Sequence, residues 1–450
     1  MPDVQGGSAS AGTDQQLRLL AAVSGTDRWS YMKPYLLVVH NMLRLGFLPY
    51  GEIVRNEHER KVNDTILAIR EKGNTIVSVW GMKMKDMITP DYETLTLLSY
   101  PNRKSVTKKD NWAEKRYSYD VYNIEDDFDA PFDTGKISQD GYKWEGGGNE
   151  GPYIYRVEDG RYLLMYSARG YNDKYYDTSQ SYGDNPLGPF HKPPLRPSAI
   201  VGANDQNDYM TGSGHSAYVR SPSGDELFCY YWVQGDPKNQ GHTPWTGEVQ
   251  QGSGRVGAFD RMFVVDTEYG KLLYGNGPTK SLQPRIGDVS GYKNIASKGH
   301  FEIENLVSGA KYINDGLFVT HEYYQDWETT IGKDGSIITI TFDEPQTVGS
   351  VMVYNSYDYN YAFKKLDYIE FDLAETPSWY SNNVVVNKAR VSNIEFSNDF
   401  VSDQNSMRQG GSCLASFDDI KVNSIKIKVS GKFNTAKPDF RISDIYVLGR

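Results

Sequence analysis

Cysteine and long apolar runs are scarce in this sequence of 450 residues. Its two cysteines, Cys229 and Cys413, cannot build a disulfide framework, and we expect both to be free, buried thiols. No stretch approaches about 18 consecutive apolar residues, which excludes a helix that spans a membrane. The first 16 residues have neither a basic region nor an apolar core, so we expect no signal peptide in this chain.

Positive charge is also in deficit. The chain has 48 basic and 58 acidic residues, which gives a net charge of −10. Binding to nucleic acid or to anionic lipid needs a concentrated positive surface, so we exclude nucleic acid as a general partner. The sequence also lacks a nucleophile elbow, a zinc-protease motif, a phosphate-binding loop and a dinucleotide fingerprint. No histidine spacing predicts a metal site.

Aromatic and turn-forming residues are abundant. The 34 tyrosines, 17 phenylalanines and 8 tryptophans make up 13% of the chain, and there are 43 glycines and 20 prolines. This composition is typical of a β-rich protein with many turns. Tyrosine and tryptophan also have an apolar face and a polar tip, which suits the CH face and hydroxyl edge of a sugar.

Short strands dominate the first part of the chain after a flexible tail at residues 1–28. Apolar-aromatic runs, most of them after a turn signal, predict strands at residues 35–39, 75–80, 162–166, 227–232 and 272–274. Another apolar strand lies upstream of each turn. About five four-stranded units in this length fit a five-bladed β-propeller at residues 29–287, with a shortened first blade.

The pattern changes near residue 280. Alternating strands are predicted at residues 337–342, 348–354, 424–429 and 445–448, and helical periodicity is absent. We expect a second domain at residues 288–450, an antiparallel jelly-roll β-sandwich. The predicted fold class is therefore all-β throughout.

The sharpest local feature surrounds Glu150, which lies between three glycines and the Gly151-Pro152 step into a strand. Flanking glycines leave a carboxylate uncrowded and let the backbone approach a ligand. At the start of an inner propeller strand, a glutamate would face the central cavity. Partial burial there raises the pKa of a carboxyl, as a general acid requires. The alternative is an ordinary solvated loop residue.

Ionisable residues recur at nearly one offset before the predicted strands. Asp64 lies 12 residues before Ile76, Glu150 12 before Tyr162, His215 13 before Phe228 and Arg261 11 before Leu272. If each residue opens an inner strand, all four converge on one axis.

The segment from Glu150 to Thr279 resembles glycoside hydrolase family 43, whose members are five-bladed propellers. The matching pieces are NEGPYI, DGRYLLMYS, NPLGPF, GSGHSAY, DELFCYYW, DRMFV and GPT. The resemblance implies inverting hydrolysis of arabinofuranosyl or xylosyl linkages in plant cell wall polysaccharide. It implies Glu150 as general acid, Asp64 as the carboxylate that tunes and positions it, and substrate-binding roles for His215 and Arg261. It implies no required cofactor, although His215 would hold a water or a calcium ion in the cavity.

The general base is not identified. The family places it in an Asp-Pro type motif at the start of the first blade, which we do not find there. Asp27, 8 residues before Tyr35, is the remaining candidate, and Glu145 is a rival to Glu150 for the acid role. Aromatic candidates for a sugar platform are Trp144, Tyr153, Trp232 and Trp245, with Trp144 favoured because it flanks the Glu150 loop.

The second domain resembles a discoidin-like (coagulation factor type C) sandwich in its NIA, INDG, ITITFDEPQTVGSVMVYNS and ISDIYVLG segments. Such modules often bind carbohydrate through loops at one end. We thus expect a monomeric glycosidase that acts outside the cytoplasm on cell wall saccharides. The alternatives are a non-catalytic carbohydrate-binding relative without a functional base, a sialidase-type propeller, for which the characteristic boxes are missing, and a purely structural protein.

Overall fold

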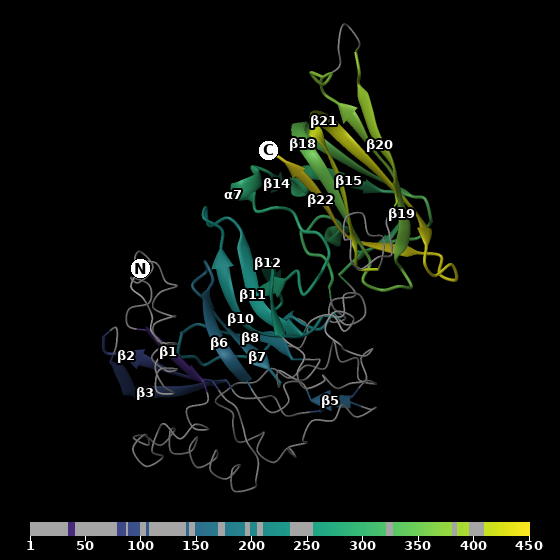
Figure 1. Cartoon of the computed structure of the whole chain (residues 1–450). Coiled ribbons are helices and arrows are strands. Elements are labelled where there is room, and N and C mark those ends of the chain that lie inside the picture. The colour runs from purple at the N-terminus through teal and green to yellow at the C-terminus, as the bar shows by residue number, and fades with distance from the viewer. Residues whose placement is uncertain are drawn as a thin grey trace. The chain divides into compact units, whose positions relative to one another are not determined.

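The computed structural model describes residues 35–40, 79–86, 89–99, 105–107, 141–143, 149–169, 176–193, 199–204, 210–234, 255–320, 327–379, 385–395 and 409–450. Almost all regular structure in these ranges is β-strand (Figure 1). The described helices are the four-residue α7 (Gly287–Ser290) and the short 3-10 turns η2 (Ala296–Lys298) and η3 (Ala310–Tyr312). The all-β prediction is confirmed. Nowhere in the described ranges is a helix long or apolar enough to cross a membrane.

The chain divides into two compact units. The first comprises residues 1–200, 214–217 and 264–273. The second comprises residues 201–213, 218–263 and 274–450.

Small sheets make up the described part of residues 1–200. One sheet has the order β1-β2-β3, another pairs β4 with β5, and a third has the order β6-β7-β8-β9. The strands are β1 (Tyr35–His40), β2 (Val79–Met84), β3 (Pro90–Ser99), β4 (Ser105–Thr107), β5 (Gly141–Lys143), β6 (Asn149–Arg156), β7 (Tyr162–Ala168), β8 (Asp177–Gly183) and β9 (Ala199–Val201). The strands predicted at residues 35–39 and 162–166 are confirmed. Of the strand predicted at residues 75–80, residues 75–78 lie outside the described ranges and the last two lie in β2.

A tight turn joins β6 to β7. The Gly160 N–H donates to the Val157 carbonyl at 3.0 Å, and Gly160 has a φ of +95°, which a side chain would disfavour. On β7, Leu163, Leu164 and Met165 are fully buried. Consecutive buried residues show that both faces of β7 are covered, because successive side chains point to opposite faces.

The next sheet also contains four strands in chain order, β10-β11-β12-β13. They are β10 (Thr211–Arg220), β11 (Leu227–Gln234), β12 (Arg255–Thr267) and β13 (Gly270–Gly275). The strands predicted at residues 227–232 and 272–274 are therefore present.

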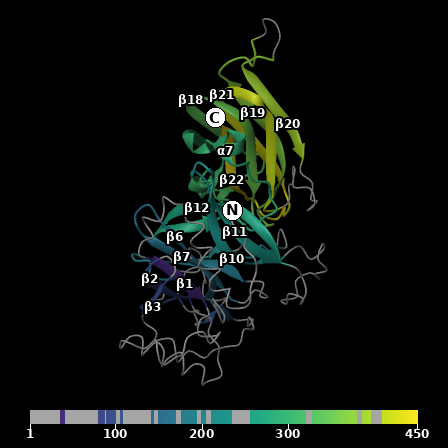
Figure 2. The same ribbon diagram turned by 60° about the vertical axis from the view of Figure 1, so that its left-hand side comes forward.

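The C-terminal part of the chain forms a nine-stranded sheet system, drawn in green to yellow in Figures 1 and 2. Its main path is β16-β17-β22-β18-β21-β19-β20, with β14 on β22 and β15 on β18. The strands are β14 (Lys293–Asn294), β15 (Gly299–Ile303), β16 (Leu306–Ser308), β17 (Thr329–Ile331), β18 (Ile337–Asn355), β19 (Phe363–Leu373), β20 (Lys388–Glu395), β21 (Ser412–Lys432) and β22 (Phe440–Gly449). A core rich in isoleucine, valine and phenylalanine, from Ile295 to Val447, holds these strands together.

The separate strands predicted at residues 337–342 and 348–354 are a single strand, β18. Its pairing with β21 moves from Thr341↔Ser424 to Gln346↔Val422, so more residues of β18 than of β21 lie between these pairs. Pro345 lies in this irregular stretch, where its missing N–H costs no ladder bond. The polar residues between the two predicted strands therefore form a bulge within one strand and not a turn that reverses the chain.

Both cysteines are free and buried, as expected, with Cys229 on β11 and Cys413 on β21. Burial raises the pKa of the Cys413 thiol. A thiol that is hard to ionise is a poor nucleophile, so Cys413 serves packing.

Candidate active site

Glu150 lies at the start of β6, beside an irregularity in the β6–β7 ladder. Glu150 pairs with Ser167 on β7, and the register then shifts before the Tyr153↔Met165 pair. Gly151, inside this bulge, has a φ of +56°. A bulge re-aims the side chain beside it, and glycine allows the left-handed backbone that the bulge needs. The bulge, which the glycine of the Gly151-Pro152 step allows, thus sets the direction of the half-buried Glu150 side chain.

The preceding residue, Asn149, anchors this end of the strand. Its fully buried side chain accepts hydrogen bonds at Oδ1 from Ser99 Oγ at 2.7 Å and from Lys192 Nζ at 2.8 Å. Lys192 is also fully buried, with Nζ 4.8 Å from the centre of the Tyr166 ring. Adjacent strand residues face opposite ways, so Asn149 fixes the backbone from the side of the sheet opposite to Glu150.

Tyr176 contacts Glu150 directly. This residue immediately precedes β8, and its hydroxyl donates to Glu150 Oε1 at 2.9 Å. The Tyr176 ring lies against Gly214, where an added Cβ would overlap the ring atoms. Gly214 in turn precedes the predicted site residue His215 on β10.

His215 packs against the bulge that carries Glu150. A Cβ at Gly151 would lie 2.9 Å from His215 Nδ1, and the His215 N–H donates to Ser167 Oγ at 2.5 Å. His215 is exposed and has a φ of +56°, an uncommon backbone conformation for a residue with a side chain. Such strain persists only where the surroundings hold it, and it is frequent at functional sites. The structure therefore brings Glu150, Tyr176 and His215 together within the first unit.

Several predicted residues lie outside the described ranges. These are Asp64, Asp27, Trp144, Glu145 and Trp245. Of the other aromatic candidates, Tyr153 is half-buried on β6, on the same face as the buried Tyr155. Trp232 on β11 is 36% exposed, with its ring edge-on to Tyr230 at 6.2 Å.

The expectation that Arg261 opens the first strand of a hairpin is wrong. Arg261 lies within β12, the third strand of its sheet, and pairs with Phe228 on β11. The reason is that residues 211–220 already form the first strand of this meander. Arg261 is nearly buried, and its guanidinium donates to Glu226 Oε1 at 2.7 Å and to the Pro284 carbonyl at 2.7 Å.

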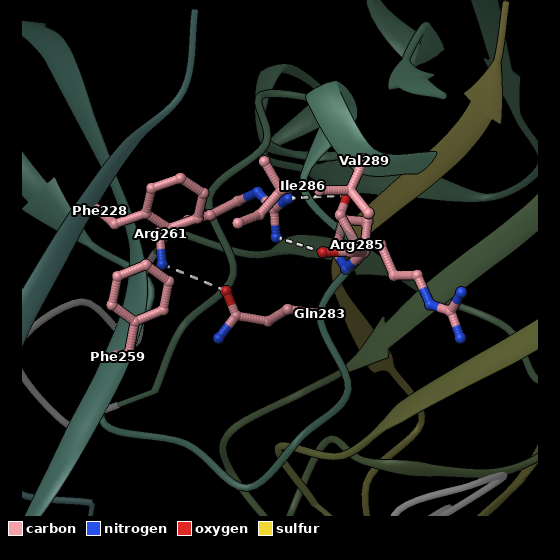
Figure 3. A pocket seen from close by; sticks show the side chains of 8 residues that line it. Phe228, Phe259, Arg261, Gln283, Arg285, Ile286 and Val289 are labelled. Carbon is pink, nitrogen blue, oxygen red and sulfur yellow. Dashed lines mark hydrogen bonds between the residues drawn. The ribbon is translucent and has the colours of Figure 1, made fainter. Parts of the chain in front are cut away.

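Arg261 helps to line a largely apolar pocket of about 350 Å³ within the second unit (Figure 3). The Phe228 and Phe259 rings on one side of it are stacked, with centroids 4.7 Å apart. The remaining lining residues are Gln283, Pro284, Arg285, Ile286 and Val289. Because its donors are used by Glu226 and backbone carbonyls, Arg261 fixes this part of the fold and we assign it no catalytic role.

Calcium does not fit the described surroundings of His215. This ion takes about six to eight oxygen ligands, several of them carboxylates. Nowhere in the described residues do three His, Cys, Asp or Glu side chains cluster closely enough to hold a metal ion. We therefore derive no step that involves calcium.

Sequence reasoning named Glu150 and His215, which the structure brings together, but it did not name Tyr176, Asn149 or Lys192, which contact this region. The strand after Tyr176 reads DTSQSYG and has no apolar alternation, so it gave no strand signal. The Glu150–Tyr176 contact depends on strand register, which the local sequence does not reveal. The one available signal was the Gly212-Ser213-Gly214-His215 segment, whose second glycine is required by the Tyr176 ring.

A family model described as glycosyl hydrolases family 43 matches residues 102–251, a third of the chain. The matched range includes Glu150, Tyr176 and His215, but neither Asp64 nor Arg261. This match supports a glycoside hydrolase. No curated protein sequence matches the chain.

Solved structures similar to this chain include a thermostable family-43 glycoside hydrolase, 25% identical over 46% of this chain and 50% of the enzyme, with a TM-score of 0.30. An endo-1,4-beta-xylanase from Bacteroides thetaiotaomicron is 19% identical over 45% of this chain and 50% of its own, with a TM-score of 0.27. The chain thus spans half the length of each enzyme. A family 32 carbohydrate-binding module of C. perfringens NanJ, in complex with galactose, is 14% identical over 34% of this chain and 95% of the module, with a TM-score of 0.24.

Proposed function

We propose that this chain is a family 43 glycoside hydrolase that cleaves arabinofuranosyl or xylosyl linkages, with Glu150 as the general acid. The observation that carries the proposal is the placement of Glu150. Its carboxyl is half-buried, aimed by a glycine bulge, and held by Tyr176 beside His215. Glu150 also lies inside the range that matches the family model.

The proposed reaction inverts the configuration at the anomeric carbon. Glu150 gives its proton to the leaving oxygen while a carboxylate base activates water on the opposite face of the sugar. Such a pair lies about 6.5–9.5 Å apart, which leaves room for the water. We propose Asp64 as the second carboxylate, which raises the pKa of Glu150 by like-charge repulsion, and Asp27 as the base to be tested first.

The proposed architecture is a five-bladed propeller at residues 29–287 and a discoidin-like sandwich at residues 288–450, after a tail at 1–28. Two four-stranded sheets in chain order support the propeller, since this is the form of a blade. The separate core that begins at Ile295 supports the sandwich. We propose that the sandwich binds polysaccharide and that the protein acts outside the cytoplasm, both by analogy with the families it resembles.

The test is turnover of arabino- and xylo-oligosaccharides and of the corresponding 4-nitrophenyl pentosides by wild type and by Glu150→Gln. Loss of a general acid lowers kcat/KM by about 10²–10⁴-fold. We expect the larger loss on the oligosaccharides, because their alkoxide leaving groups need a proton more than 4-nitrophenolate does.

Glu158→Gln is the matched control, since Glu158 is exposed in the turn of the same hairpin. It should retain full activity. Asp64→Asn and Asp27→Asn show whether these residues belong to the reaction. Full oligosaccharide turnover by Glu150→Gln would disprove the acid assignment.

The second candidate function is carbohydrate binding without catalysis. It is favoured by the absence of an Asp-Pro motif at the start of the predicted first blade, where the base is expected. It predicts that wild type and Glu150→Gln bind pentose oligosaccharides equally well in calorimetry, with no product released.

A further inference from the structure

The Tyr176 hydroxyl donates a hydrogen bond to one of the two carboxyl oxygens of Glu150. It donates to Oε1 at 2.9 Å, and an oxygen that accepts this hydrogen is a poor place for the carboxyl's own proton. We propose that Tyr176 is a positioning residue that keeps the acid proton of Glu150 on Oε2 and sets the upper pH limit of turnover. This inference rests on the proposed role of Glu150 as general acid.

The hydrogen bond has a definite electrostatic effect. A donor to a carboxylate stabilises the charged form and therefore lowers the pKa of that carboxyl. A general acid works only while it is protonated, so a lower pKa moves the alkaline limit of activity down. Tyr176 opposes the effect of partial burial, which raises the pKa of a carboxyl.

The fold holds the Tyr176 ring in place. Its side chain is 1% exposed, and its ring lies on the buried Gly214. Gly214 does not have a positive φ, and the three atoms nearest to an added Cβ all belong to the Tyr176 ring, so alanine there presses on that ring without an unfavourable backbone conformation. The backbone continues from Gly214 into His215, whose N–H donates a hydrogen bond to Ser167 Oγ. Tyr176 and His215 are thus positioned by one strand.

Other ionisable groups lie on the elements around Glu150. They are His215 on β10, Arg169 after β7, Asp177 on β8, and Lys192, which contacts Asn149. None of these groups is altered when Tyr176 becomes phenylalanine. Tyr176→Phe therefore isolates the contribution of the hydroxyl.

The experiment titrates the Glu150 carboxyl by carbon NMR of protein labelled at the glutamate carboxyl carbon. The signal is assigned by its loss in Glu150→Gln. A hydrogen bond to a charged group corresponds to about one pH unit, so Tyr176→Phe should raise the midpoint by about that amount. The alkaline limb of kcat/KM on pentose oligosaccharides should move up equally. Tyr162→Phe on β7 is the control and should change neither.

Gly214→Ala provides a second route, in case Tyr176→Phe does not fold. Its methyl group displaces the Tyr176 ring and should raise the same midpoint, whereas Gly224→Ala, in open space at a turn, should not. An unchanged Glu150 midpoint in both Tyr176→Phe and Gly214→Ala overturns the inference. Full turnover by Glu150→Gln would instead overturn the proposed function, and the NMR result would still report on the hydrogen bond.

Discussion

At the scale of single residues, Gly151 in the bulge beside Glu150 is a position where the structure requires glycine. Its φ of +56° disfavours a side chain, and so does His215, because an added Cβ would lie only 2.9 Å from Nδ1 of that ring. We expect Gly151→Ala to lower the free energy of unfolding by about 1–2 kcal/mol and to reduce glycosidase activity at least tenfold, because Glu150 and His215 must move apart. Chemical denaturation and turnover assays measure the two effects.

Gly160→Ala is the control, because it introduces the same kind of backbone strain away from Glu150 and His215. Gly160 has a φ of +95° at the other end of β6, with nothing within 4 Å of an added Cβ. This variant should lose a similar amount of stability and keep its activity. If both variants are equally active, Gly151 has no role in placing Glu150.

At this residue scale, sequence reasoning located Glu150 from its glycine context and His215 from its offset before a strand. Sequence reasoning could not show that the missing side chain at Gly151 makes room for His215 and not for a ligand. Nor could it show that the Tyr176 hydroxyl bonds the Glu150 carboxyl. Both contacts join different strands, and they depend on a bulge and a register that tertiary packing sets.

At the scale of elements, Arg261 ties strand β12 to the segment before α7. Its guanidinium bonds Glu226 and the Pro284 carbonyl, and the Gly287 N–H donates to Glu226 Oε2 at 2.5 Å. Arg261→Met would leave these acceptors without their charged donor. We expect the free energy of unfolding to fall by about 3 kcal/mol with KM for oligosaccharides unchanged, as thermal unfolding and steady-state kinetics would show.

The exposed Lys293–Asp225 pair in the same unit provides the control. Lys293→Met should have little effect on stability, because water screens exposed ion pairs. A raised KM in Arg261→Met without loss of stability would instead support the substrate-binding role that the family resemblance implies. The family resemblance implies that role, whereas the equal offsets predicted only that Arg261 opens an inner strand, and an offset cannot distinguish the first strand of a meander from the third.

At the scale of the whole molecule, composition was sufficient for the all-β class. Abundant aromatics, frequent turns and missing helical periodicity all favour strands. The order of the nine-stranded system was not predictable, since β22 at the end of the chain pairs with β14, β17 and β18 from far earlier. Such long-range pairing is decided by burial of matching faces, which a local pattern does not specify.

The same burial makes the C-terminal sheet system sensitive to pH through Glu328. Its side chain is 2% exposed and accepts hydrogen bonds from Ser356 Oγ at 2.7 Å and the Tyr357 N–H at 2.8 Å. Burial raises the pKa of Glu328 from 4.5 to about 7, more than these bonds and Arg441 lower it. The stability that this group contributes is fully present below pH 4.5. It is lost as the pH rises through 7, because the folded state then holds a buried charge.

Glu328→Gln should remove this loss. Glutamine stays neutral, can accept from the Tyr357 N–H and can donate to Ser356 Oγ, so it resembles the protonated acid. We expect wild type and variant to unfold alike at pH 5, and the variant to be more stable at pH 8 by on the order of 3 kcal/mol. Thermal unfolding at the two pH values tests this, with the exposed Glu344→Gln as control. Asp315 and the buried Asp444, whose pKa values desolvation also raises, are unchanged in every variant. Their effect cancels in the comparison, so a difference between Glu328→Gln and wild type that does not vary with pH would show that the pKa of Glu328 is the same in the folded and unfolded states and is not raised by burial.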